Sequence, residues 1–115
     1  MKNLGFIGLG NMGKGMANNL ASNNYNVIGY DLNPEATKNL LKNKNFTAGR
    51  NIEEVVYASD VIFTMLPDGQ AVRVVWNEIL KFVSSDKILV DCSTIDVKTS
   101  LEVQKKAYDN ELFTL

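Results

Sequence analysis

The 115-residue sequence contains no histidine and a single cysteine. Without histidine there is no serine–histidine or cysteine–histidine pair and no imidazole ligand for a metal ion. One cysteine excludes an internal disulfide bond and a cysteine-based zinc cluster. We therefore expect no metal site, and any proton transfer has to come from a carboxylate, a lysine, a tyrosine or a bound cofactor.

An excess of one charge and long apolar runs are also missing. The chain has 12 Lys and Arg residues against 13 Asp and Glu, a net charge of −1 that does not attract nucleic acid or an anionic membrane. No stretch approaches the roughly 20 apolar residues of a membrane span, and the N-terminus has no signal-peptide pattern. With one thiol, these absences favour a cytoplasmic protein that binds neither nucleic acid nor membrane.

The sequence itself is that of one globular domain. Hydrophobic residues make up 45% and charged residues 22%, and with only 2 prolines there is no candidate linker. Short runs rich in branched and aromatic residues, typical of buried strands, occupy residues 4–9, 26–30, 61–66 and 88–90.

Amphipathic segments alternate with these runs. Met12, Met16 and Leu20 recur at helical spacing, and further helices are expected after Asn33-Pro34, after Asn51 at 52–58, after Asp68, and from Thr94 or Asp96. This alternation predicts a Rossmann-type, doubly wound α/β fold over residues 1–115, with a parallel sheet covered on both faces.

Three glycines form the motif G-x-G-x-x-G between the first predicted strand and the first predicted helix. Gly8 would permit a tight turn, Gly10 would let backbone approach a pyrophosphate, and Gly13 would let the helix pack close to the strand. The helix N-terminus would direct its free N–H groups at the phosphates. The alternative interpretation is a glycine-rich turn that binds no ligand.

Asp31 closes the second predicted strand about 20 residues later, where an acidic side chain accepts hydrogen bonds from the adenine ribose. Its charge would repel the 2′-phosphate of NADP, and no Arg follows it at residues 32–34. We therefore expect NAD as the cofactor, in preference to NADP. The alternative is an aspartate that only caps a turn.

Residues 6–20, FIGLGNMGKGMANNL, resemble the N-terminal signature of the β-hydroxyacid dehydrogenases, which include 3-hydroxyisobutyrate dehydrogenase. Residues 64–67 (TMLP) and 91–96 (DCSTID) are similar to two further segments of that family. The resemblance implies the N-terminal NAD-binding domain of a longer oxidoreductase, truncated before an all-helical C-terminal domain. Such an enzyme transfers hydride between NAD and a small 3-hydroxyacid or semialdehyde carboxylate.

The resemblance also assigns roles to individual positions. It implies that Ser93 binds the substrate's carboxylate or hydroxyl and that Asp31 binds the adenosine ribose. The pyrophosphate and nicotinamide sides of the cofactor would be contacted by Leu9, Gly10, Asn11, Met12, Leu66, Pro67 and Thr94. Taken alone, the residues favour a helix cap for Ser93 and Thr94 and a helix entry for Leu66-Pro67.

The lysine that exchanges a proton with the substrate in this family, in a K-x-x-x-N pattern on a later helix, has no counterpart here. Lys14 and Asn18 spell the pattern within the first predicted helix, which we interpret as coincidence. We therefore expect no catalytic residue in this chain. A chain that ends inside a strand near Leu112 leaves an open sheet edge, which favours a homo-oligomer.

Two other functions stay open at this stage. One is the cofactor domain of an enzyme of the 6-phosphogluconate dehydrogenase type, which shares the fold. The other is a nucleotide-binding module without catalysis, which the missing lysine would also fit.

Overall fold

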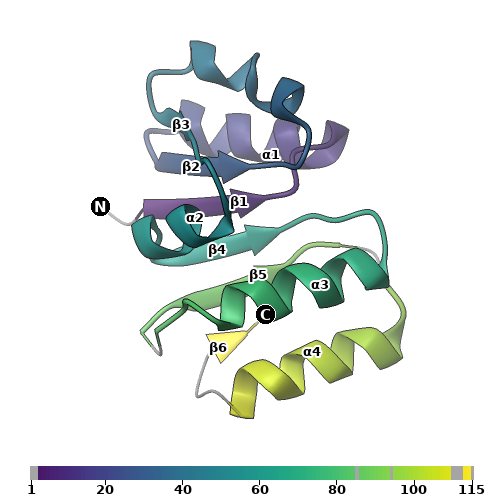
Figure 1. Ribbon diagram of the computed structural model, residues 1–115. Helices are drawn as coiled ribbons and strands as arrows, with labels where there is room; N and C mark the ends of the chain where they lie inside the picture. Colours follow the sequence, from purple (N-terminus) through teal and green to yellow (C-terminus); the bar gives the residue numbers. More distant parts are fainter. Residues whose placement is uncertain (1–2, 85, 94, 110–112, 115) are drawn as a thin grey trace.

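The computed structural model describes residues 3–84, 86–93, 95–109 and 113–114. Its strands form one parallel sheet in the order β3-β2-β1-β4-β5-β6 (Figure 1). The strands are β1 (Asn3–Ile7), β2 (Asn26–Tyr30), β3 (Phe46–Ala48), β4 (Val61–Thr64), β5 (Ile88–Asp91) and β6 (Phe113–Thr114). This is the strand order of the dinucleotide-binding Rossmann fold, which confirms the predicted fold class.

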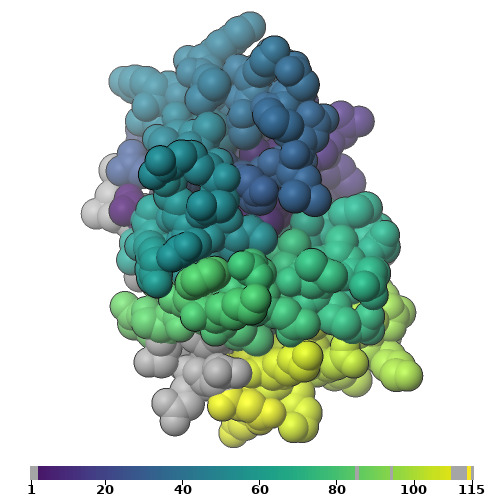
Figure 2. Space-filling model, viewed as in Figure 1, coloured from purple at the N-terminus to yellow at the C-terminus, as the bar shows by residue number. Residues whose placement is uncertain are grey.

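The connections between strands divide between the two faces of the sheet. They are helices α1 (Asn11–Ser22), α2 (Ile52–Ala58), α3 (Gly69–Leu80) and α4 (Val97–Asp109), with 3-10 turns η1 (Pro34–Thr37) and η2 (Leu40–Lys42). One core cluster joins α1 and η2 to β1 and β2, through Ala17, Leu40, Phe6 and Val27. The other joins α2, α3 and α4 to the opposite face, where α2 and α3 cover the sheet in Figure 2.

Side-chain caps begin three of the four helices. Asn51 Oδ1 accepts a hydrogen bond from the Glu54 N–H (2.8 Å), and Asp68 Oδ1 accepts one from the Ala71 N–H (2.8 Å). Asp96 Oδ2 likewise accepts from the backbone N–H of Thr99 (2.8 Å). These are the caps that the sequence predicts. Thr94, the other candidate start of the last helix, lies outside the described residues.

One predicted helix is wrong in detail, and one strand is missed. The segment after Asn33-Pro34 forms two short 3-10 turns in place of one helix. Leu40 is the only buried side chain in these two turns, so little packing is present to stabilise a longer helix. Strand β3 is not predicted at all, since it has three residues and only Phe46 among them is buried. Within the described part of the chain, no helix has both the length and the apolar content to cross a membrane.

Candidate functional site

The carboxyl ends of β1, β2, β4 and β5 lie along one edge of the parallel sheet (Figure 1). The chain leaves β1 towards α1 on one face and leaves the adjacent β4 towards α3 on the other face. Such a reversal opens a crevice, and dinucleotides bind there in folds of this order.

Two of the motif glycines are required by close contacts of the backbone. Gly8 has φ +97°, and a Cβ there would lie 2.2 Å from the carbonyl oxygen of Met65. A Cβ on Gly13 would lie 2.2 Å from the carbonyl oxygen of Gly8. The loop therefore turns sharply out of β1, and α1 packs directly against it.

The third motif glycine lies in open space. Gly10 is the N-cap of α1, and a Cβ there would meet no atom within 4 Å. No side chain caps this helix and its first turn contains no acid, in contrast to the capped helices α2, α3 and α4. The N-terminus of α1, with Asn11 and an exposed Met12, can therefore present its positive end to an anion.

Asp31 is half-buried beside this loop, and two backbone groups hold its carboxylate. The Leu9 N–H donates to Oδ2 (2.7 Å) and the Asn33 N–H donates to Oδ1 (2.8 Å). The Leu9 side chain is fully buried in the core, so only its backbone faces the site. The carboxylate thus has a fixed position and keeps lone pairs for a hydroxyl-bearing ligand.

A cavity of about 270 Å³ lies between the loop that joins β1 to α1 (residues 8–10, the glycine loop) and the turn after β2. Its lining consists of Leu9, Gly10, Asn11, Lys14, Asp31, Asn33, Glu35 and Ala36. The sequence predicts a ligand at four of these positions, but it misses Lys14, Asn33, Glu35 and Ala36. Helical spacing places Lys14 one turn after Gly10, and that spacing is the signal that could have found it.

A second group of predicted residues lies at the ends of β4 and β5. The Leu66 N–H donates to Ser93 Oγ (2.7 Å), and the Ser93 N–H donates to Asp91 Oδ1 (3.2 Å). A Cβ on Gly8 would lie 3.0 Å from Leu66 Cδ2, so this group adjoins the glycine loop. Pro67 follows Leu66 and is exposed, whereas Thr94 lies outside the described residues.

The described residues at this edge of the sheet give little support for a reactive cysteine or a metal site. Burial, and secondarily the nearby Asp91 carboxylate, raises the pKa of the Cys92 thiol, which therefore stays protonated at neutral pH. Among the described residues, no three His, Cys, Asp or Glu side chains lie close enough to hold a metal ion.

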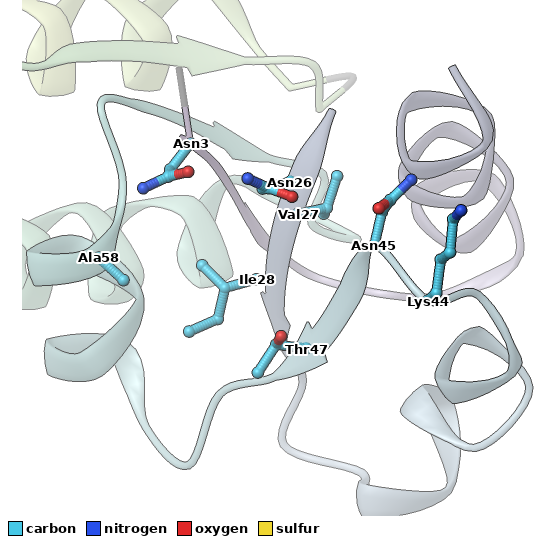
Figure 3. Close-up of a pocket in the computed structure, with 8 residues that line it drawn as sticks. All are labelled: Asn3, Asn26, Val27, Ile28, Lys44, Asn45, Thr47 and Ala58. Atoms are coloured by element: carbon cyan, nitrogen blue, oxygen red, sulfur yellow. The ribbon is translucent and has the colours of Figure 1, made fainter. Parts of the chain in front are cut away.

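A second cavity, of about 280 Å³, lies at the opposite edge, where β1 and β2 begin (Figure 3). Its polar lining includes Asn3, Asn26 and Asn45, and the amide of Asn45 is already bonded to the Ala21 carbonyl (2.9 Å). Cofactors of parallel α/β sheets bind at the carboxyl ends of the strands. The cavity in Figure 3 is therefore separate from the candidate site.

Comparison with known families shows which kind of domain contains this glycine-rich turn. The family model for the NAD-binding domain of 6-phosphogluconate dehydrogenase matches residues 3–115. The chain belongs to this family of NAD-binding domains. Family membership places the G-x-G-x-x-G turn within an NAD-binding domain.

Several similar proteins are 3-hydroxyisobutyrate dehydrogenases. The mitochondrial enzyme of Mus musculus is 41% identical over 106 residues, which cover 90% of this NAD-binding domain and 31% of the relative. A probable mitochondrial enzyme of Dictyostelium discoideum is 41% identical over 105 residues, covering 89% and 32%. The structure of the Mycobacterium tuberculosis enzyme with L-serine superposes with a TM-score of 0.93 at 32% identity, over 99% of this chain and 39% of that one.

These relatives confirm the resemblance to the N-terminal NAD-binding domain of the β-hydroxyacid dehydrogenases. The chain spans only about a third of the length of the curated relatives it matches, since the matched residues cover 31% and 32% of those two proteins.

Proposed function

We propose that residues 1–115 are the cofactor-binding part of an oxidoreductase that transfers hydride between NAD and a small 3-hydroxyacid or semialdehyde carboxylate. The observation that carries this proposal is the combination of an uncapped α1 N-terminus at Gly10 with the fixed carboxylate of Asp31 in one cavity. When bound, NAD supplies the hydride acceptor, and the protein supplies position and charge.

The described residues fit such a dinucleotide. The open space at Gly10 and the N–H groups at Asn11 and Met12 suit the pyrophosphate, and Asp31 suits the adenosine ribose. Leu66 and Pro67 would pack beside the cofactor, towards its nicotinamide end. The roles of Ser93 at the substrate and of Thr94 at the nicotinamide follow from the family resemblance and belong to the same proposal.

NAD is proposed in preference to NADP because Asp31 places a negative charge where the 2′-phosphate would lie. Neither oxygen can turn away without breaking a bond to Leu9 N–H or Asn33 N–H. A fixed anion repels a second anion more effectively than a side chain that is free to rotate.

The hydroxyacid substrate class is supported by the names of the relatives, and 6-phosphogluconate by the name of the family model. We favour the former because a relative named 3-hydroxyisobutyrate dehydrogenase is 41% identical over 106 residues. The proposal places the proton-exchanging lysine outside these 115 residues, so the chain alone is expected to bind cofactor without turnover. A cytoplasmic location stays a prediction, because some relatives are named as mitochondrial enzymes.

Calorimetric titration of the chain with NADH and with NADPH tests the proposal. Wild type should bind NADH more tightly, and Asp31→Ala should weaken NADH binding about tenfold or more while changing NADPH binding less. Glu35→Gln is the matched control, since it removes another carboxylate of the same cavity. Tighter binding of NADPH by wild type, or equal losses in the two variants, would contradict the proposal.

A further inference from the structure

A chain of hydrogen bonds leads from the hydrophobic core to the loops at the ends of β4 and β5. Trp76 Nε1–H donates to Thr64 Oγ1 (3.1 Å), and the Thr64 hydroxyl donates to Asp91 Oδ1 (2.8 Å). Trp76 and Thr64 are each only 1% exposed. The Trp76–Thr64 bond therefore lies where water does not compete for it, and the Thr64–Asp91 bond is partly buried.

The direction of every bond in this chain is determined. The Thr64 hydroxyl has one hydrogen, and since its oxygen accepts from Trp76, that hydrogen goes to Asp91. Asp91 Oδ1 accepts a second bond from the Ser93 N–H (3.2 Å), which anchors the loop that follows β5. Asp91 therefore joins the buried Trp76–Thr64 pair to the backbone of Ser93.

Ser93 continues the connection into the neighbouring loop. Its Oγ accepts a bond from the Leu66 N–H (2.7 Å), which ties the loop after β5 to the loop after β4. In the described part of the chain, the Ser93 hydroxyl hydrogen has no acceptor. A serine whose oxygen accepts from a backbone N–H keeps its hydroxyl hydrogen available to donate to water or to a ligand.

We propose that Asp91 is a positioning residue: it holds Ser93 so that its hydroxyl donates to an acceptor oxygen of the ligand. The inference rests on the proposed function for the existence of that ligand. The acceptor class is a carboxamide or carboxylate oxygen, present in the nicotinamide group of the cofactor and in a small carboxylate substrate. Asp91 itself acts through Ser93 and the Leu66 backbone.

The test compares variants that keep or remove the acceptor at residue 91. Asp91→Ala removes both bonds, whereas Asp91→Asn keeps an oxygen that can accept from Thr64 and Ser93. In the ligand-free chain, amide hydrogen exchange at Leu66 and Ser93 should accelerate about tenfold in Asp91→Ala and stay near wild type in Asp91→Asn. The fluorescence of Trp76, the only tryptophan, should shift in the alanine variant alone.

The ligand arm uses NADH, ADP-ribose and 3-hydroxyisobutyrate as probes. ADP-ribose lacks the nicotinamide, so Asp91→Ala should leave its affinity unchanged. A loss of about tenfold for NADH assigns the acceptor to the nicotinamide, and a loss only when 3-hydroxyisobutyrate is added with NADH assigns it to the substrate. In a Ser93→Ala background, Asp91→Ala should cause no further loss, because the effect passes through Ser93.

Three results would overturn the inference: unchanged exchange at Leu66 in Asp91→Ala, equal effects of the alanine and asparagine variants, or a fall in ADP-ribose affinity as large as the fall in NADH affinity. If wild type bound none of the probes, the proposed function would be wrong and the ligand role of Ser93 with it. The exchange measurement would then still decide whether Asp91 holds the two loops together.

Discussion

Two aspartates that end strands have the same structural task at the carboxyl edge of this sheet. Asp31, directly after β2, accepts hydrogen bonds from the backbone N–H groups of Leu9 and Asn33, and Asp91, the last residue of β5, accepts one from the N–H of Ser93. Each carboxylate thereby fixes a loop that the proposed ligand touches. Loops ordered in advance lose less conformational entropy when a ligand binds.

Lys14 is the residue that we expect to modify the cofactor preference. It lines the cavity with Asp31, and no ion pair joins it to any residue in the described part of the chain. Its ammonium group would attract a 2′-phosphate that Asp31 repels. Lys14→Gln should therefore weaken NADPH binding several-fold, on the order of 3–10-fold, and weaken NADH binding less.

The measurement is a pair of titrations with NADPH and NADH, and Lys38→Gln is the control. Lys38 is paired with Glu35 (2.9 Å) and is not part of the cavity lining. Equal changes in affinity for the two cofactors, or the same effect in the control variant, would show that Lys14 does not interact with the 2′-phosphate of NADPH.

At the scale of elements, α1 combines weak local preferences with a functional N-terminus. It has no side-chain cap and contains Gly13 and Gly15 within its 12 residues. Its buried residues are Gly13, Ala17 and Ala21, so packing against β1 and β2 has to stabilise it. The open N-terminus that suits a phosphate thus comes at a cost in helix stability.

Gly15→Ala should stabilise the chain by about 0.5–1 kcal/mol, because alanine lowers the entropy of the unfolded chain and a Cβ there meets nothing within 4 Å. Gly13→Ala is the opposite case, since its Cβ would lie 2.2 Å from the Gly8 carbonyl oxygen, and should destabilise by about 1–3 kcal/mol. Urea unfolding measures both. A destabilised Gly15→Ala chain would show that Gly15 has a role in packing or binding.

The sequence predicts those elements whose signals are local. The caps Asn51 and Asp68, the motif turn at Gly8 and the buried runs of β1, β2, β4 and β5 all depend on residues close together in the chain. It does not predict β3, whose three residues form a strand only because they pair with β2. It also does not predict the Thr64–Asp91 bond, since those residues are 27 positions apart.

At the scale of the whole molecule, the described helices are divided unequally between the two faces of the sheet: α1 packs on one face, and α2, α3 and α4 pack on the other. On the face of α1, the register places Ile88 beside Val61 and Val90 beside Phe63. Ile88 and Val90 are only half-buried and belong to neither core cluster. This incomplete cover on β5, like an open sheet edge, favours association with another surface.

We expect the isolated chain to self-associate through this face, with sedimentation velocity showing larger species as the concentration rises. Val90→Lys should shift the chain to monomer, because a charge at a half-buried contact is costly to desolvate. Leu101→Lys on α4 is the control, as Leu101 is 63% exposed on the other side of the sheet. A monomer at all concentrations would contradict this expectation.

The central claim is that NAD binds across the glycine loop and Asp31 at the carboxyl edge of the sheet. Its most direct test is an NMR titration of the ¹⁵N-labelled chain with NADH, observing backbone amides. The account predicts that the largest shifts fall at Gly10, Asn11, Met12 and Asn33, while Asn3 and Asn45 at the opposite edge stay unchanged. Shifts concentrated at Asn3 and Asn45, or no shifts at saturating NADH, would contradict it.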